Sequence, residues 1–210
     1  FQASPSGQAL LNSMTDKGLK GLSFWHSGMK QLSADKPLLV PSDARGLKVR
    51  VENSDVLVAV FDQLGANPQK MAFSEVYGAL QTGVVDGQEN SWSNIYGQKF
   101  YEVQDGITNT DHGVLDYMLV TSSRWWDGLE DEDRRDLTKI LEEVTTERNQ
   151  AVNELEAEAR KAIADAGTEI RELTPEQRQQ WVDALRPVWK RFTPDVGADT
   201  LKAAQAANQS

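Results

Sequence analysis

Residues 131–165 form the longest segment with an uninterrupted helical pattern, and this segment limits what the chain can fold into. It contains neither glycine nor proline, and its apolar residues recur close to one face: Leu137, Leu141, Val144, Val152, Leu155, Ala159 and Ile163. At about 1.5 Å per residue such a helix is roughly 50 Å long, which is several times the usual helix length. A helix of this length exceeds one small lobe, so we expect it to span two.

The rest of the chain alternates between strand and helix patterns. Residues 47–52 alternate cleanly, with Leu47, Val49 and Val51 on one side and polar residues on the other. Further strands are expected at 22–25, 84–86 and 115–121, and helices at 1–18, 54–65, 74–83 and 90–100. The run TPEQ at 174–177 is a capping box that starts another helix. This order predicts an α/β fold with ligands beyond the carboxyl ends of the strands.

Composition excludes several functions. The 210 residues carry a net charge of −10 without a cluster of Lys and Arg, which argues against binding of nucleic acid. The chain has no cysteine, so disulfides and thiol chemistry are excluded. The longest apolar run, 56–61, is far shorter than the roughly 20 residues of a membrane span. The chain opens on Phe1 rather than Met, and we expect an upstream signal segment to have been removed.

Signatures of catalysis and of cofactor binding are missing from the sequence. It has no glycine-rich phosphate loop, no nucleophile elbow and no zinc-binding histidine pair, and only two histidines in all. We therefore expect a binding protein with no enzyme activity, no cofactor and no metal site. Two rivals stay open: an enzyme that acts on an acid, which predicts product formation, and a helical adaptor built around 131–165, which predicts self-association without a ligand.

Arg50 is the main candidate for ligand binding. The alternation places it on what we expect to be the exposed face of a strand, and a polar loop segment follows at 65–90. A guanidinium binds a carboxylate through two parallel hydrogen bonds. The alternative interpretation is a solvated arginine without a ligand. A strand-borne arginine near a polar loop favours a protein that recognises small organic acids.

Longer motifs resemble a known family. The runs RGLKVRVENSDV, LGANPQKMAFSEVYGALQTGVVDGQENSWSNIYGQKFYEVQ and TNTDHG, within about residues 18–125, resemble the DctP-type solute-binding proteins of tripartite ATP-independent periplasmic (TRAP) transporters. The resemblance implies a two-lobe periplasmic-binding-protein fold of type II-like architecture, with the long helix shared by both lobes. It also implies a periplasmic protein that captures a small organic acid, such as a dicarboxylate or sugar acid, and delivers it to the membrane subunits of a TRAP permease. A ligand-sensing domain of a signalling system is the alternative.

The resemblance also implies roles for single residues. Arg50 matches the arginine that forms a salt bridge with the ligand carboxylate, Asn90 the asparagine that hydrogen-bonds the same group, and Phe73 an aromatic residue on the ligand body. Asn53 and His112 match positions of polar or water-mediated contacts in some members. The alternatives are a helix cap for Asn90, a hydrophobic staple for Phe73 and a backbone hydrogen bond within its turn for His112.

Two further residues complete the predicted site. Lys30 lies in FWHSGMKQLS, where the family segment often carries an arginine. A lysine keeps the charge but loses the planar fork, so we expect a different distal group on the ligand or a contact through water. Trp25, near the first crossover between lobes, either lines the cleft or fills the core.

The resemblance sets the expected domain organisation. Residues 1–27 and 116–155 belong to a first lobe, and residues 28–115 and 156–210 form the second. The family's first lobe begins with elements that precede Phe1, roughly the first third of a typical member. We therefore expect the first lobe to be incomplete in this chain.

Overall fold

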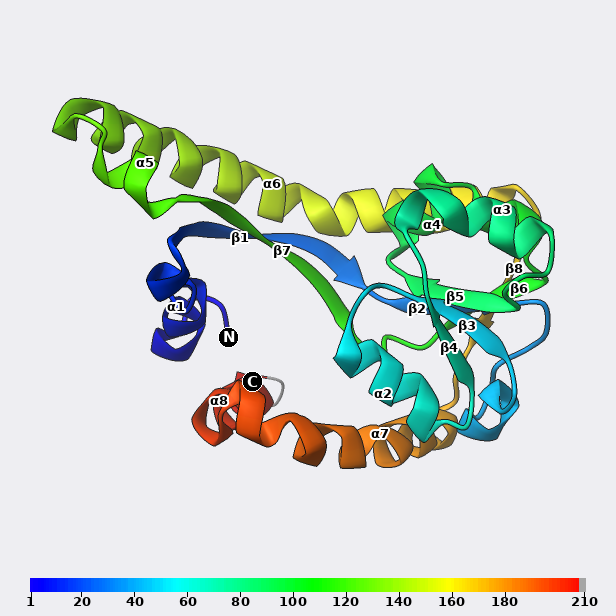
Figure 1. Ribbon diagram of the computed structural model, residues 1–210. Coiled ribbons are helices and arrows are strands. Elements are labelled where there is room, and N and C mark those ends of the chain that lie inside the picture. The colour runs from blue at the N-terminus through cyan, green and yellow to red at the C-terminus, as the bar shows by residue number, and fades with distance from the viewer. Residues whose placement is uncertain (208–210) are drawn as a thin grey trace. The chain divides into compact units, whose positions relative to one another are not determined.

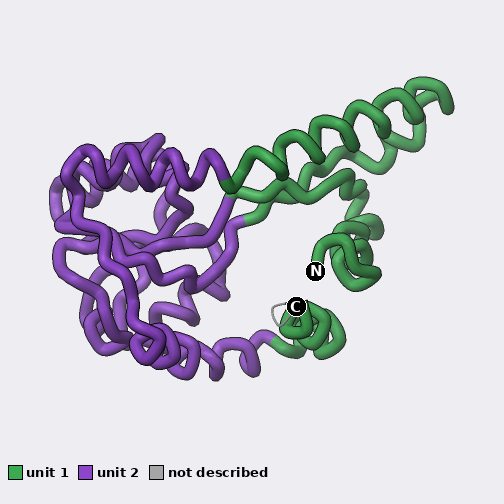
Figure 2. Tube along the Cα trace, turned by 180° about the vertical axis from the view of Figure 1, so that it is seen from behind, with its two compact units in different colours: residues 1–27, 116–153, 193–210 green, residues 28–115, 154–192 purple. Residues whose placement is uncertain are grey.

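The computed structural model describes residues 1–207, which form two compact units (Figure 2). Unit 1 contains residues 1–27, residues 116–153 and the described chain from 193 onward, and unit 2 contains residues 28–115 and 154–192. The predicted second lobe includes the segment after 192, whereas that segment groups with unit 1. The lobe boundaries themselves stay a prediction.

Unit 2 is built on a six-stranded sheet in the order β4-β3-β5-β2-β6-β8 (Figure 1). Its strands are β2 Gln31–Ala34, β3 Lys48–Val51, β4 Asn67–Lys70, β5 Gly87–Asn90, β6 Gly106–Asn109 and β8 Glu169–Glu172. β3 runs parallel to β4 and β5, and β6 parallel to β8, while β2 is antiparallel to β5 and β6. The carboxyl ends of β3, β4, β5 and β6 therefore meet at one edge of the sheet, where β2 begins. We call this edge the carboxyl edge.

Helices cover both faces of this sheet (Figure 1). They are α2 Asp55–Gln63, α3 Val76–Gln81, α4 Trp92–Gly97 and parts of α6 Asp131–Asp165 and α7 Pro175–Val196, with 3-10 helices at Pro41–Ala44 (η2), Phe73–Glu75 (η3) and Phe100–Val103 (η4). On one face Phe61 of α2 and Trp181 of α7 pack with Val49 and Val51 of β3. Fully burying a side chain such as Phe61 contributes about 1.5–3 kcal/mol. The predicted strand at 47–52 thus points its apolar side into a core.

The second face carries its own apolar cluster. Val76 of α3, Ile95 of α4 and Ile163 of α6 pack with Phe100 and with Ile107 of β6. Ile95, Phe100, Ile107 and Ile163 are each 0% exposed. Both sheet faces are thus covered, and unit 2 also buries polar residues: Ser33, Gln88 and Thr108 within strands, and Lys30, Arg50, Glu89 and Asn90 at or near strand ends.

The predicted strand at 84–86 is wrong. Residues 84–86 form a bend, and the strand that follows is β5 Gly87–Asn90. Val84 and Val85 both direct their backbone N–H groups to the carbonyl oxygen of Ala79, at 2.9 and 3.3 Å. These bonds satisfy a free carbonyl at the end of α3, so the two valines close a helix instead of entering the sheet.

Unit 1 contains a two-stranded sheet of β1 Leu19–Met29 and β7 Val114–Ser122, whose last and first residues respectively belong to unit 2. Its helices are α1 Pro5–Leu11, the 3-10 helix Thr15–Lys17 (η1), α5 Ser123–Asp127, α8 Ala198–Ala207 and the remaining parts of α6 and α7. Asn149 of α6 binds the backbone of β1: its Nδ2 donates to the Phe24 carbonyl at 2.9 Å, and its Oδ1 accepts from the His26 N–H at 2.9 Å. These bonds fix α6 to β1.

The predicted long helix is confirmed as α6, a single helix of 35 residues. Residues 131–153 of α6 belong to unit 1 and residues 154–165 to unit 2. The predicted capping box at 174–177 is also present: the Thr174 N–H donates to Gln177 Oε1 at 2.9 Å, and the Gln177 N–H donates to Thr174 Oγ1 at 3.2 Å. Both features depend on neighbours in sequence, which makes them predictable.

Candidate functional site

Arg50 lies on β3 at the carboxyl edge and is only 1% exposed. Its Nε and Nη2 both donate to the carbonyl oxygen of Met71, at 3.1 and 2.9 Å. Its Nη1 is buried and has no hydrogen-bond partner within the described residues. Burial lowers the pKa of Arg50, and the carboxylates of Glu52 and Glu89 act in the opposite direction. Because arginine stays protonated in proteins, the site holds a buried cation with an unused donor.

The exposed strand face predicted for Arg50 is wrong, and so is the alternative of a solvated arginine. Lys48, two residues earlier on the same side of β3, is exposed. Arg50 is covered because the chain after β4 crosses it at Met71 and continues to Phe73, whose ring centre lies 5.7 Å from the guanidinium carbon. The alternation identified the side of the strand but not the segment that covers it.

Phe73 lies at the start of η3 and is 37% exposed. Its ring meets the ring of Phe100 edge-on, with 5.7 Å between the centres, so one part of the side chain packs on the core of unit 2. The remaining apolar surface lies beside the Arg50 guanidinium. Phe73 is thus both a packing residue and a potential contact for the carbon skeleton of a ligand.

Asn90 is the last residue of β5 and is 1% exposed. Its Oδ1 accepts from the Ser91 N–H at 3.1 Å and from Asn94 Nδ2 at 2.7 Å. Since a backbone N–H is only a donor, the atom facing Ser91 must be the amide oxygen. The NH2 group of Asn90 is therefore the part left to donate, and a carboxylate is a matching acceptor.

A carboxylate from α6 takes the place of a side-chain cap at α4. Glu156 Oε2 accepts from the Trp92 N–H at 2.9 Å, and Oε1 accepts from the Ser93 N–H at 3.0 Å. Ser91, at the cap position, makes no side-chain capping bond. The proposed helix cap role of Asn90 is thus filled by Glu156, and Asn90 is fixed through Ser91 and Asn94 instead.

Sequence reasoning missed Glu89, which lies in the middle of β5 and is 0% exposed. Lys30 donates from Nζ to Glu89 Oε1 at 3.1 Å. The same Nζ lies 3.0 Å from Oε2, within ion-pair distance but outside hydrogen-bonding direction. Lys30 also lies 3.7 Å from Glu52. A buried carboxylate needs such a cation nearby. The sequence signal that could have identified Glu89 is an acidic residue between Gln88 and Asn90 in a short strand.

His112 lies close to the same carboxylate. Its Nδ1 is 2.7 Å from Thr110 Oγ1, and its Nε2 is 3.6 Å from Glu89 Oε2. The predicted alternative, a backbone hydrogen bond within the turn, is replaced by this contact with a side-chain hydroxyl. Its ring also meets Phe61 edge-on, with 6.5 Å between the centres.

The carboxyl edge thus collects groups from five strands or their ends. Arg50 is the last residue but one of β3, Phe73 follows β4, Glu89 is the third and Asn90 the last residue of β5, Lys30 precedes β2, and His112 follows β6. Within the described residues, Arg50 Nη1, Glu89 Oε2 and His112 Nε2 are buried without a hydrogen-bond partner. Buried polar atoms are rarely left unpaired, so a cluster of them at one edge marks a candidate site for a polar ligand.

Two predicted site residues lie apart from this cluster. Asn53 is exposed in the connection between β3 and α2. Trp25 belongs to unit 1, where its Nε1 donates to Thr145 Oγ1 of α6 at 3.0 Å. Their predicted ligand contacts stay predictions.

A profile of the DctP family, described as bacterial extracellular solute-binding protein, family 7, matches residues 1–195. The chain belongs to the DctP family. The resemblance seen in the sequence motifs is therefore confirmed, and so is the mixed α/β fold of its members.

Named relatives in the DctP family share much of this sequence. The C4-dicarboxylate-binding periplasmic protein DctP of Vibrio cholerae is 64% identical over 209 residues, which are 100% of this chain and 63% of the relative. The protein of the same name from Shewanella loihica is 49% identical over 210 residues, 100% of this chain and 62% of the relative. The chain thus spans about 63% of the length of these curated relatives.

Solved DctP-family structures share the fold. A TRAP periplasmic solute-binding protein from Shewanella oneidensis with bound succinate superimposes with a TM-score of 0.96 at 51% identity, over 99% of this chain and 68% of that one. One from Pseudomonas aeruginosa with bound L-malate has a TM-score of 0.89 at 41% identity, over 91% of this chain and 67% of that one. Within residues 1–207, none of the helices combines the length and the apolar character that crossing a membrane requires.

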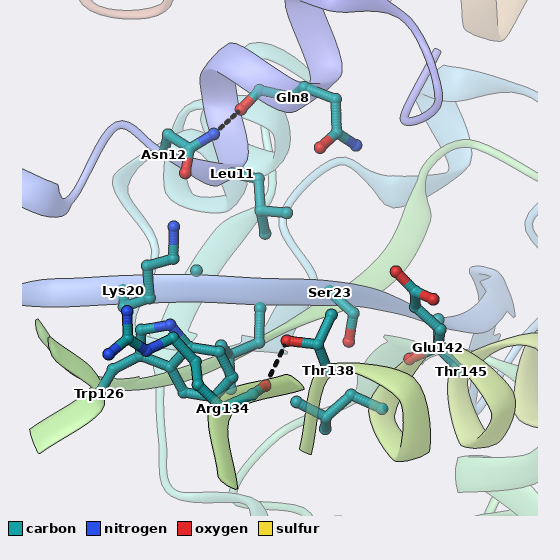
Figure 3. Close-up of a pocket in the computed structure, with 13 residues that line it drawn as sticks. Gln8, Leu11, Asn12, Lys20, Ser23, Trp126, Arg134, Thr138, Glu142 and Thr145 are labelled. Atoms are coloured by element: carbon teal, nitrogen blue, oxygen red, sulfur yellow. Dashed lines mark hydrogen bonds between the residues drawn. The ribbon is translucent and has the colours of Figure 1, made fainter. Parts of the chain in front are cut away.

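A cavity of about 400 Å³ lies in unit 1 (Figure 3). It is lined by residues of β1 and α6, by the end of α1 with Asn12, and by Trp126, and none of the predicted site residues is among them. Two buried polar atoms of its lining, Ser23 Oγ and Arg134 Nε, have no hydrogen-bond partner in the described part of the chain. All of its lining residues belong to unit 1, so this cavity is separate from the carboxyl edge of unit 2.

Proposed function

We propose that the protein is an extracytoplasmic solute-binding protein that captures a small organic acid, specifically a C4-dicarboxylate, and delivers it to a TRAP-type membrane permease. The buried Arg50 guanidinium carries this proposal, because its Nη1 is an unused donor on a cation that solvent does not reach. The free NH2 group of Asn90 ends the neighbouring strand β5. Together they offer two kinds of donor to one carboxylate.

Energetics favour a carboxylate over a neutral ligand. Hydrogen bonds to charged groups contribute about 1.5–3 kcal/mol each, and the contribution grows where water is excluded. Arg50 is held in place before the ligand arrives, because Met71 accepts from both Nε and Nη2. Phe73 adds apolar surface for the carbon skeleton.

Comparison with relatives supports the C4 class. Relatives at 64% and 49% identity are named C4-dicarboxylate-binding proteins, and the structures at 51% and 41% identity hold succinate and L-malate. The structures that hold galacturonate or glucuronate are 26–30% identical. The similarity is thus greater to proteins that bind four-carbon diacids than to those that bind sugar acids.

Capture without chemical change is part of the proposal. The family consists of substrate-binding transport proteins, and the carboxyl edge offers charges and hydrogen-bond donors for holding an acid. Incubation with L-malate, followed by proton NMR, is expected to return the acid unchanged. Conversion to another product would support the enzyme interpretation.

Calorimetric titration with succinate, L-malate and D-glucuronate tests the binding function, using the 210-residue chain and the same protein with a complete first lobe. Arg50→Gln is expected to weaken succinate binding at least 100-fold, because it removes the buried cation. Arg186→Gln is the matched control, since the Arg186 side chain on α7 is 60% exposed and pairs with the neighbouring Asp183. Unchanged succinate binding by Arg50→Gln, or binding of none of the acids by the complete protein, would overturn the proposal.

A further inference from the structure

The Lys30–Glu89 ion pair has no role in the proposed function so far. Both residues are buried, with Lys30 5% and Glu89 0% exposed, and Nζ lies 3.0–3.1 Å from the two carboxylate oxygens. At this depth an unpaired ion is strongly destabilising. The two charges therefore depend on each other, and together they present a net charge of zero.

The charges near this pair determine how strongly the carboxyl edge attracts an anion. Arg50 is the second cation at this edge, and the carboxylates of Glu52 and Glu89 both favour its protonated form. Glu52 lies 3.7 Å from Lys30, but its side chain is 41% exposed, so solvent weakens its effect. Glu89 is thus the acidic residue that offsets the Lys30 ammonium. Without it, the edge would present two cations to a ligand.

We propose that Glu89 is a specificity-determining residue that neutralises Lys30, so that the carboxyl edge accepts one carboxylate, at Arg50 and Asn90, and not two. This inference rests on the proposed function and assigns Lys30 a role different from the one implied by the resemblance. Lys30 does not pair with the distal carboxylate; it balances Glu89. The preference of the site for a dianion over a monoanion then depends on Lys30 and Glu89 cancelling each other's charge.

Substituting Lys30 and Glu89 one at a time distinguishes a Lys30 that balances Glu89 from a Lys30 that contacts the ligand. The probes are succinate, a dianion, and succinamate, a monoanion of nearly the same size, and the readout is the ratio of their dissociation constants. Glu89→Gln frees the ammonium and is expected to shift this ratio about tenfold toward succinate, as one added charge several Å away does at intermediate dielectric. Lys30→Gln leaves Glu89 unpaired and is expected to shift it about tenfold the other way.

The double variant Lys30→Gln with Glu89→Gln decides the inference. It removes both charges together and keeps two side chains that can hydrogen-bond each other, so it folds without an unpaired buried ion. A neutral pair predicts a succinate to succinamate ratio within about threefold of the wild type. Direct contact between Lys30 and the distal carboxylate predicts that the double variant loses succinate preference as much as Lys30→Gln does. That second result overturns the inference, even where a single variant fails to fold.

Glu52→Gln is the matched control, since it removes an acidic charge near the same ammonium from an exposed side chain. Its ratio is expected to stay within about twofold of the wild type. A shift as large as that of Glu89→Gln would show that the charge near Lys30 matters without regard to burial, which contradicts the inference. Failure of the wild type to bind succinate refutes the proposed function, whereas normal binding with unchanged ratios in all variants refutes only this inference.

Discussion

Glu156 on α6 accepts the backbone N–H of Trp92, the first residue of α4, at 2.9 Å. Its other oxygen accepts the N–H of Ser93. A carboxylate at a helix N-terminus satisfies free N–H groups and interacts favourably with the helix dipole. Because Asn90 is held by Ser91 and by Asn94 of the same helix, Glu156 supports a residue that we propose contacts the ligand.

Glu156→Ala should lower the free energy of unfolding by about 1–2 kcal/mol, as loss of a helix cap does. It should also weaken succinate binding severalfold, because Asn90 loses its fixed orientation. Urea unfolding and calorimetric titration measure the two effects. Glu158→Ala serves as control, since Glu158 is an exposed residue of the same helix. Equal losses of stability and of succinate binding in Glu156→Ala and Glu158→Ala would show that a general change in α6, and not loss of the α4 cap, causes them.

Gly28 is expected to resist substitution for two reasons. Its φ of +129° is one that L side chains rarely adopt, and a Cβ there would lie 2.5 Å from Glu156 Oε2. Gly28→Ala should therefore destabilise the protein by more than Gly18→Ala, whose φ is +78° but whose Cβ meets no atom within 4 Å. The Gly18 variant is expected to cost about 1–2 kcal/mol from the backbone alone. Urea midpoints that rank the variants the other way would contradict the close approach.

Thr174→Ala should destabilise α7 by about 1 kcal/mol, because it removes the hydroxyl that accepts the Gln177 N–H. The same substitution at Thr146 should be neutral or slightly stabilising. Thr146 is exposed in the middle of α6, where its Oγ1 donates to the Glu142 carbonyl, and alanine has the higher helix propensity there. Thermal unfolding tests whether Thr174→Ala lowers the stability while Thr146→Ala does not. A loss of stability in both variants would count against the capping assignment.

Asp55 should give a measurable pH dependence. The hydrogen bond from Lys70, with Nζ 2.7 Å from Oδ1, and the Lys70 charge hold the pKa of Asp55 below its usual value of 3.8. The folded state therefore binds this proton more weakly than the unfolded chain, so the stabilisation is complete above pH 3.8 and disappears as the pH falls through the lower folded pKa. Asp55→Asn should be less stable than wild type at pH 7, and the difference should shrink as the pH falls below 3.8.

Acid titration of unfolding, followed by circular dichroism, measures that difference. Asp62→Asn is the control, because Asp62 is an exposed residue of the same helix α2. A difference between wild type and Asp55→Asn that persists unchanged to pH 2 would rule out the Lys70 contact as its origin.

The two-stranded sheet of unit 1 should be protected in a protein with the full length of its relatives. Isolated two-stranded sheets are marginally stable, and their edges leave N–H and C=O groups unpaired. Hydrogen exchange of β1 and β7 is expected to slow in the longer protein, while exchange in β3 and β5 of unit 2 stays the same. Equal exchange of β1 and β7 in both forms would show that the completing segment binds elsewhere.

Features that depend on neighbouring residues could be predicted from the sequence. The uninterrupted pattern at 131–165 identified α6, and TPEQ at 174–177 identified the start of α7. The motif around Arg50 and Asn90 indicated the family, which the comparisons confirm. The strand predicted at 84–86 failed because the N–H groups of Val84 and Val85 bind a carbonyl of the preceding helix, an outcome that short-range alternation does not encode.

The sequence alone determined which residues share a face and where the long helix begins and ends, since both follow from backbone periodicity. Only the tertiary structure decided that Arg50 is buried under Met71, that Lys30 is neutralised by Glu89, and that Glu156 holds the helix after Asn90. These contacts join residues 21 to 64 positions apart. Burial and charge pairing depend on which segments meet in space, and periodicity along one strand carries no information about that.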